Sequence, residues 1–406
     1  MTENAGLRRL LTSEGQALLS VLPPYDPAIA MRLNEELRKV ADPELVAAAL
    51  TQQHLRQRAE AKLGEFARTL LFTEAGLQQA TRLEVAAQHA RRYRDAGIER
   101  VYDLGCGLGI DSLALAALGL GVTAVEADEA TAALATYNLR TFENARVIHG
   151  DALEVAAGAL GQGDGAYADP ARRTSTGRTF DPAAYSPPLG MVLDLRERTP
   201  ALGVKAAPGI GYEHLPEDVH AQWVSVGGSV VEAGLWFGPL APGGPGRSAL
   251  VIGPHGHADL AVTVDPRSPA AAAPVVEEDV SEGYLVEPDG AVIRAGGVAA
   301  LAALIGGRSV SEGIAYLAAD EPHRGPFGES FEVLEAFPYS RARLSAWCRR
   351  EGIGALEIKK RGVDVVPDQL RKALRLRGPN AATVILTRVR GRHHAIVARR
   401  VVPNPS

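Results

Sequence analysis

Acidic residues close four short apolar runs in the central part of the chain. They are Asp103, Glu126, Asp151 and Asp169. Runs of this length are typical of buried strands in an α/β sheet, and ligands bind where such strands end. A row of carboxylates at that edge suits a ligand that carries positive charge and hydroxyl groups. One such acid is often only a solvated strand end, but four in succession predict a binding site.

Glycines at alternate positions follow the first of these acids, in Asp103-Leu-Gly-Cys-Gly-Leu-Gly-Ile-Asp111. Because glycine lacks a Cβ, Gly105, Gly107 and Gly109 can adopt positive φ and let the backbone pass close to a ligand. A helix-prone apolar segment comes next, and the N–H groups of its first turn lack intrahelical partners. The pattern therefore predicts a strand, a tight loop and a helix that form a nucleotide-type pocket.

The spacing of these glycines narrows the choice of ligand. The dinucleotide pattern G-x-G-x-x-G would need its third glycine where this chain has Ile110. A carboxylate at Asp103 would repel a pyrophosphate, whereas it suits the amino group and sulfonium of S-adenosylmethionine. The segment resembles motif I of the class I S-adenosylmethionine-dependent methyltransferases. The alternative is a glycine-rich turn in some other α/β enzyme.

The resemblance implies an α/β fold with a Rossmann-like, seven-stranded methyltransferase domain, here expected at residues 69–255, and S-adenosyl-L-methionine as cofactor. Three apolar segments, 201–206, 228–237 and 247–252, would complete the seven strands. An acid at the end of the second strand typically binds ribose hydroxyls. The resemblance implies that Asp151 and Ala152, after the third strand, lie where the family reads the adenine edge. The residues implied for the cofactor pocket are Phe72, Thr73, Asp103, Gly105, Gly107, Gly109, Asp111, Glu126, Ala127, Asp151, Ala152 and Asp169.

Helices are expected ahead of this domain, over residues 1–68, where apolar residues recur at intervals of three and four. This region either packs only as a cap or also helps to hold the substrate. Thr73 is a plausible N-cap of the next helix. The segment around Phe72-Thr73 resembles the one before motif I in trimethylguanosine synthases, which implies that both residues lie against the cofactor. The alternative is that Phe72 is a hydrophobic staple and Thr73 a helix cap, and that neither contacts a ligand.

A candidate catalytic motif, Asp169-Pro-Ala-Arg-Arg173, follows the fourth expected strand. It is similar to the Asn/Asp-Pro-Pro-aromatic motif of methyltransferases that act on exocyclic amines. The resemblance implies that Asp169, with Pro170, aligns a base nitrogen and helps to deprotonate it. Arg172 replaces the aromatic residue and would orient the substrate, because a guanidinium can stack on a base or hold a phosphate.

Methylation of a base carbon is disfavoured, because it needs a nucleophilic cysteine. Cys106 lies in the cofactor loop and Cys348 in the C-terminal segment. The loop over residues 174–188 leaves the end of the fourth strand and is long enough to form a binding loop or lid. Within it, Tyr185 either stacks on a base or merely packs.

The C-terminal part is expected to hold two small α+β domains, at residues 275–329 and 330–406. In the first, Tyr284-Leu-Val-Glu-Pro-Asp-Gly-Ala-Val-Ile-Arg294 predicts a hairpin with Pro-Asp-Gly at its tip. The second alternates strands and helices. It resembles the THUMP-like domain of a group of bacterial methyltransferases, in which the preceding unit is ferredoxin-like. THUMP domains bind RNA, so the resemblance implies an RNA partner, such as rRNA, tRNA or another small RNA.

Charge supports that expectation. Residues 341–400 contain 16 Lys/Arg and 4 Asp/Glu, in a chain whose net charge is −5. A dense cationic segment binds phosphates by releasing counterions. The alternative is a solvated or internally neutralised surface. The residues expected to bind RNA are Lys359, Lys360, Arg361, Arg371, Lys372, Arg375 and Arg377.

Composition sets the remaining expectations. Two cysteines suggest no disulfide framework and fit a reducing cytoplasm. No apolar stretch approaches the length of a membrane span, and no His/Cys spacing predicts a metal site. The function expected is an S-adenosylmethionine-dependent methyltransferase that acts on a base nitrogen of RNA. Two alternatives stay open: a small-molecule or protein methyltransferase, and a non-catalytic RNA-binding factor that keeps the cofactor fold. The oligomeric state stays open too.

Overall fold

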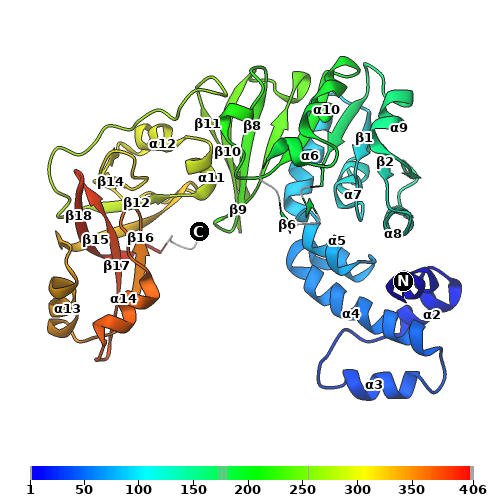
Figure 1. Ribbon diagram of the computed structural model, residues 1–406, viewed down its shortest axis with the longest axis horizontal. Coiled ribbons are helices and arrows are strands. Elements are labelled where there is room, and N and C mark those ends of the chain that lie inside the picture. Colours follow the sequence, from blue (N-terminus) through cyan, green and yellow to red (C-terminus); the bar gives the residue numbers. More distant parts are fainter. Residues whose placement is uncertain (1, 172, 175–176, 179–180, 255, 403–406) are drawn as a thin grey trace. The chain divides into compact units, whose positions relative to one another are not determined.

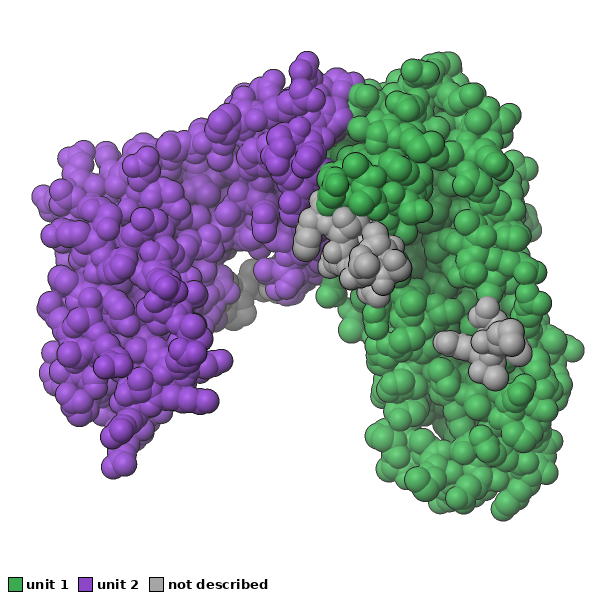
Figure 2. Space-filling model, in the orientation of Figure 1, with its two compact units in different colours: residues 1–207, 235–244 green, residues 208–234, 245–406 purple. Residues whose placement is uncertain are grey.

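The computed structural model describes residues 2–171, 173–174, 177–178, 181–254 and 256–402 (Figure 1). Its contacts divide the chain into two compact units. The first comprises residues 1–207 and 235–244, and the second comprises residues 208–234 and 245–406 (Figure 2).

The first unit begins with helices, as the apolar spacing predicts. They are α1 (Thr2–Leu10), α2 (Ser13–Val21), α3 (Ala30–Leu37), α4 (Pro43–Leu63), the 3-10 helix η1 (Gly64–Arg68), α5 (Glu74–Gln79) and α6 (Leu83–Asp95). Asp42 caps α4 by accepting from the backbone N–H groups of Glu44 and Leu45, and Pro43 occupies the first helical turn. Among the described residues, no helix is both long and apolar enough to cross a membrane.

Parallel strands and helices follow in alternation. They are β1 (Arg100–Leu104), α7 (Ile110–Ala117), β2 (Gly121–Glu126), α8 (Glu129–Leu139), β3 (Ala145–His149), α9 (Ala152–Ala159) and β4 (Gly165–Ala168). The loop region after β4 contains β5 (Arg173–Thr174), β6 (Gly177–Arg178), η2 (Pro182–Ala184), α10 (Leu189–Leu193) and η3 (Asp194–Glu197), and leads to β7 (Ala201–Ala206). β1 pairs in parallel with β2 on one side and with β4 on the other. This is the point where the strand order reverses, and ligands bind there in open α/β sheets.

The remaining strands of this sheet are β8 (His220–Val226), β9 (Ser229–Trp236), β10 (Gly246–Gly253) and β11 (Gly256–Val262). The 3-10 helices η4 (Tyr212–His214) and η5 (Gly238–Leu240) lie in the connecting segments. The strand order is β11-β10-β8-β9-β7-β4-β1-β2-β3. The Rossmann-like α/β class is therefore confirmed, but in the described part of the chain the sheet has nine strands and not seven. The sequence did not predict β8 and β11, because β8 buries polar side chains such as Gln222 and Ser225, and β11 is largely exposed.

One buried side chain joins the helical region to the glycine loop. Asn138 on α8 is 2% exposed. Its Oδ1 accepts from the N–H of Leu71 at 2.8 Å, and its Nδ2 donates to the carbonyl oxygens of Leu71 and Leu108 at 3.1 and 3.0 Å. Because every polar atom of the amide is paired inside the protein, the segment before α5 is fixed against the loop after β1.

A second sheet forms most of the second unit. Its elements are β12 (Tyr284–Pro288), α11 (Gly290–Arg294), α12 (Val298–Ile305), β13 (Arg308–Ser309), β14 (Leu317–Ala319), β15 (Gly328–Pro338), α13 (Arg341–Arg350), β16 (Ile353–Lys360), α14 (Pro367–Leu374), β17 (Asn380–Val389) and β18 (Arg392–Arg400). The strand order is β13-β14-β12-β15-β18-β17-β16, so β16 lies at an edge. The hairpin predicted over residues 284–294 is wrong. Asp289 accepts from the N–H of Ala291 at 2.7 Å, which starts α11 where a turn was expected.

The sheet of the second unit has an apolar core on each face. Alternate residues of β17 serve the two cores: Val384 and Leu386 pack beneath α13 and α14, while Ile385 faces Phe331 and Tyr316. The mixed α+β character expected for this part is confirmed. However, β12 pairs with β15, so the boundary expected between residues 329 and 330 falls inside one sheet. The division into 1–68, 69–255, 275–329 and 330–406 stays a prediction.

Candidate active site

The loop after β1 adopts the backbone that its glycines predict. Gly105, Gly107 and Gly109 have φ values of 86°, 55° and 80°. The N–H groups of Gly105 and Cys106 both donate to the carbonyl oxygen of Val125, at 2.9 and 3.0 Å. A Cβ on Gly107 would meet no atom within 4 Å, so there is open space beside the loop. The loop is thus tied to β2 on one side and open to a ligand on the other.

Asp103 ends β1 as a buried acid, with 1% of the residue exposed. The hydroxyl of Ser112 donates to its Oδ2 at 2.5 Å. Burial, followed by the charges of Asp111 and Asp169, raises the pKa of Asp103 from 3.8 to about 7, although the Ser112 hydrogen bond and the charge of Lys205 oppose this. Burying the ionised form of Asp103 therefore costs free energy, which a nearby cation would offset.

Asp111, in the first turn of α7, is the second buried acid. Its Oδ1 lies 2.8 Å from Nδ1 of His89, and its Oδ2 accepts from the hydroxyl of Thr81 at 2.6 Å. Burial raises the pKa of Asp111, but the hydrogen bond and charge of His89, with Lys205 and Thr81, outweigh burial and hold this pKa below its usual value. The ring of His89 packs against Tyr167 and Trp236. Asp111 is thus a structural anchor.

Asp169 directly follows β4 and forms an ion pair with a buried lysine, Lys205. Nζ of Lys205 lies 2.8 Å from Oδ2 of Asp169 and 2.9 Å from the hydroxyl oxygen of Thr81. The side chain of Lys205 is 5% exposed, whereas that of Asp169 is 28% exposed. The parallel register pairs Ala168 with Val204, so the next residue of each chain segment lies side by side. Sequence reasoning missed Lys205, Thr81 and His89; the only signal was one lysine inside the apolar run of β7.

The acids after β2 and β3 are already bonded to backbone N–H groups. Oε2 of Glu126 accepts from Gly107 at 3.0 Å, which places this acid at the glycine loop. Asp151 caps α9 by accepting from Leu153 and Glu154 at 2.9 and 3.0 Å. Ala127 is exposed and Ala152 is half-buried. The structure therefore brings Asp103, Asp111, Glu126 and Asp169 around the end of β1, and every predicted contact with the cofactor, including those of Ala127, Asp151 and Ala152, stays a prediction.

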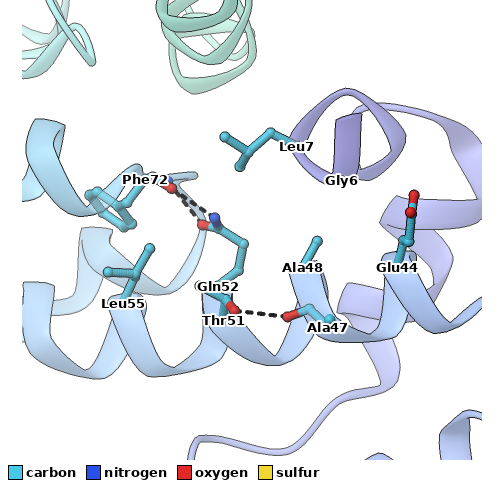
Figure 3. Close-up of a pocket in the computed structure, with 9 residues that line it drawn as sticks. All are labelled: Gly6, Leu7, Glu44, Ala47, Ala48, Thr51, Gln52, Leu55 and Phe72. Carbon is cyan, nitrogen blue, oxygen red and sulfur yellow. Dashed lines mark hydrogen bonds between the residues drawn. The ribbon is translucent and has the colours of Figure 1, made fainter. Parts of the chain in front are cut away.

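Phe72 and Thr73 lie between η1 and α5. Phe72 is fully buried, and its backbone N–H and carbonyl both bond to the side chain of Gln52, at 2.9 and 2.7 Å. Together with Leu7 and Leu55 it lines a cavity of about 290 Å³ between α1 and α4 (Figure 3). Thr73 caps α5 by accepting from Gly76 at 2.9 Å. The cap is present, and cofactor contact by Phe72 and Thr73 stays a prediction.

The loop after Asp169 is held at its two ends. Pro170 is buried, and Ala171 exchanges two backbone hydrogen bonds of 2.9 Å with Ser186. Arg172 lies outside the described residues. Tyr185 is 3% exposed, and its hydroxyl oxygen accepts from the N–H of Ala207 at 3.3 Å. This tyrosine packs inside the protein, so its stacking on a base is not supported.

The basic residues expected to bind RNA fall into two groups. Lys359, Arg361 and Arg371 are in ion pairs: Lys359 with Glu287 at 2.5 Å, Arg361 with Glu287 at 3.9 Å, and Arg371 with Asp368 at 2.7 Å. Lys360, Lys372, Arg375 and Arg377 make no ion pair within the described part of the chain. In that part, His, Cys, Asp and Glu residues form no group of three suited to a metal ion.

Replacing Asp103 with Asn tests the cost of the buried acid. Between pH 3.8 and about 7 the folded protein keeps a proton that the unfolded chain has released, so stability is lost as the pH rises through this window. We expect Asp103→Asn to raise the free energy of unfolding of the ligand-free protein by on the order of 2 kcal/mol more at pH 8 than at pH 5. Urea denaturation at both pH values measures the difference.

Asp128→Asn is the control, because the pKa of Asp128 is shifted in the opposite direction. Hydrogen bonds from the side chain and backbone of Thr131 hold this pKa below its usual value, so Asp128 is ionised at both pH 5 and pH 8. Asp128→Asn should therefore change the free energy of unfolding equally at the two pH values. Equal effects of Asp103→Asn at pH 5 and pH 8 would contradict the raised pKa of Asp103.

Comparison with known proteins agrees with this geometry. The chain is 35% identical over 345 residues to S-adenosylmethionine-dependent methyltransferases from two strains of Mycobacterium tuberculosis, CDC 1551 and H37Rv, covering 82% of this chain and 90% of each relative. A family model described as THUMP domain-like matches residues 328–400, and a model of a domain of unknown function matches residues 3–59.

A solved structure shares the fold across nearly the whole chain. It is a Porphyromonas gingivalis W83 protein proposed to be a methyltransferase, with a TM-score of 0.72 over 94% of this chain and all of that chain, at 20% identity. At that identity the likeness shows the fold alone, whereas the mycobacterial relatives show the family. The chain belongs to the S-adenosylmethionine-dependent methyltransferases, carries a THUMP-like domain at its C-terminal end, and uses S-adenosylmethionine as its cofactor.

Proposed function

We propose that the protein transfers a methyl group from S-adenosylmethionine to a base nitrogen of RNA. The observation that carries the proposal is the partly exposed carboxylate of Asp169, which lies beside the cofactor loop at the strand reversal. Gly105, directly after β1, comes so close to Asp169 that a Cβ there would lie 3.4 Å from the carbonyl oxygen of Asp169. Cofactor and substrate sites are thus adjacent.

The residues around the glycine loop fit the cofactor. Open space lies beside Gly107, and the buried Asp103 provides negative charge for a cationic ligand. Glu126 lies within hydrogen-bond distance of the loop backbone, where it would bind ribose hydroxyls. S-adenosylmethionine supplies a methyl group already activated on a sulfonium. The protein's residues therefore need only to bind, to orient the acceptor nitrogen and to exclude water.

Asp169 is suited to orient an N–H group. Its Oδ2 is held by Lys205, while among the described residues its Oδ1 has no hydrogen-bond partner. An oxygen free to accept can align the target nitrogen at hydrogen-bond distance. The motif departs from Asp-Pro-Pro-aromatic, and Tyr185 is packed away, so the assignment of a base nitrogen depends on Asp169 and Pro170 alone.

The basic part of the second unit supports RNA as substrate. Lys372 lies on α14, and Arg375 and Arg377 lie directly after it. Lys360 ends the edge strand β16. Cations on α14, in the segment after it and on the neighbouring strand, none of them in an ion pair with a described residue, can bind phosphates without reading sequence.

A second candidate function has its own observation. Lys359, Arg361 and Arg371, expected to bind RNA, are neutralised by Glu287 and Asp368. This favours a methyltransferase of small molecules or proteins, in which the basic segment stabilises its own unit.

Asp169→Ala tests the catalytic assignment. We expect it to reduce transfer of labelled methyl groups to total RNA from a deletion strain by at least about a hundredfold, the usual scale for a group that positions a proton. Cofactor affinity, measured by calorimetry, should change little because Asp103 and the glycine loop are intact. Transfer at the wild-type rate in this variant would refute the role of Asp169.

Neutralising Lys360, Lys372, Arg375 and Arg377 to Gln tests the RNA partner. Loss of four phosphate contacts should weaken binding to bulk tRNA and lower the slope of log K against log salt by up to about three units. Filter binding at several salt concentrations measures this slope.

The control removes the same charge from exposed cations of the first unit, Arg38, Lys39, Arg91 and Arg94. If both variants lower the slope equally, the binding is non-specific attraction, and if neither does, the second candidate function is favoured.

A further inference from the structure

We propose that Lys205 is a positioning residue for methyl transfer: its buried ammonium holds one oxygen of Asp169 so that the other faces the acceptor nitrogen. The proposal rests on the proposed function, because it takes Asp169 as the group that orients the substrate. Neither the family's motif I nor the Asp-Pro motif assigns a role to a lysine near the end of β7.

The first support is the burial and bonding of this lysine. Only 4% of Lys205 is exposed, and its Nζ donates to Asp169 and Thr81 at 2.8 and 2.9 Å. A buried ammonium is costly unless opposite charges and hydrogen bonds offset the loss of water. Here the charge of Lys205 lowers the pKa of both Asp103 and Asp111, so three carboxylates share its field. Because burying this ammonium costs desolvation free energy, we infer that Lys205 does more than fill space.

The second support is the asymmetry of the contact with Asp169. Lys205 reaches Oδ2 alone, and 28% of the Asp169 side chain stays exposed. A carboxylate anchored at one oxygen cannot rotate freely, so the direction of the other oxygen is fixed before the substrate arrives. Such preorganisation lowers the cost of aligning the acceptor at the moment of reaction.

The third support is the connection to the cofactor side of the site. The hydroxyl of Thr81 accepts from Lys205 and donates to Asp111 at 2.6 Å, and Asp111 also contacts His89. Asp111 lies in the first turn of α7, directly after the glycine loop. A continuous chain of hydrogen bonds therefore sets Asp169 relative to the element that binds the cofactor.

Lys205→Met tests the proposal, because methionine keeps much of the length of the side chain and loses the charge. We expect the rate of labelled methyl transfer to total RNA at saturating S-adenosylmethionine to fall by about tenfold to a hundredfold, with cofactor affinity changed less than about threefold. In Lys205→Ala, added ethylamine should restore part of the rate. A rate within twofold of wild type, or a parallel loss of rate and cofactor affinity without amine rescue, would overturn the proposal.

Lys62→Met is the control for loss of a lysine, here half-buried, that lies outside the site. Among the described residues, Nζ of Lys62 donates to the carbonyl oxygens of Leu77, Gln78 and Ala80 and to no carboxylate. It should destabilise the fold without lowering the transfer rate of the folded protein. An equal loss of rate in this control would show that Lys205 acts through stability alone.

A double-mutant cycle separates failure of this proposal from failure of the proposed function. If the wild-type protein methylates no RNA, the RNA assignment fails. The interaction between Lys205 and Asp169 is then tested by its effect on the free energy of unfolding. Lys205→Met and Asp169→Asn should each destabilise the protein, and the double variant should lose less than their sum, because each single variant leaves a charge uncompensated. Additive effects would contradict a direct Lys205–Asp169 interaction.

Discussion

The site depends on a buried carboxyl group, Asp103, whose ionised form costs free energy to bury. Asp103 lies at the end of β1 beside two other acids, and burial raises its pKa to about 7. Proteins rarely keep such an arrangement unless function needs it, because removing the charge would stabilise the fold. We propose that the sulfonium and ammonium groups of S-adenosylmethionine offset this cost on binding, so that Asp103 favours a cationic ligand.

The surrounding elements both create this site and limit its cost. Parallel pairing of β1 with β2 and β4 brings Asp103, Glu126 and Asp169 to one edge of the sheet. Glycines with positive φ leave open space where a ligand can approach the backbone. Lys205 supplies one compensating cation. These acids therefore differ in environment: Asp111 bonds His89 and Thr81, Asp103 is buried, and the side chain of Asp169 is partly exposed, where we propose that it contacts the substrate.

Features that depend on local residue chemistry could be predicted from the sequence, whereas contacts that depend on packing between distant segments could not. Gly105, Gly107 and Gly109 could be placed because their lack of a Cβ has one local consequence, and apolar runs located β1, β2, β3, β4 and β7. Asp289 was misassigned because Pro-Asp-Gly suits both a turn and a helix start, and only the following residues' packing selects α11. The contact of Lys205 with Asp169 depends on strand register, which a single sequence does not specify. Likewise, charge counting could not show that Glu287 neutralises Lys359, since the two residues are far apart in the chain.

The most direct test is the affinity for S-adenosylmethionine at pH 8 and pH 6, measured by calorimetry on the wild-type protein and on Asp103→Asn. If binding needs ionised Asp103, with its pKa of about 7, the wild-type dissociation constant should rise about tenfold from pH 8 to pH 6. The variant should bind more weakly at pH 8 and lack this added loss at pH 6; because it sees the same titration of the ligand's amino group, it isolates the carboxylate. A variant that binds as tightly as the wild type at pH 8, or a wild-type affinity no more sensitive to pH than the variant's, would contradict the account.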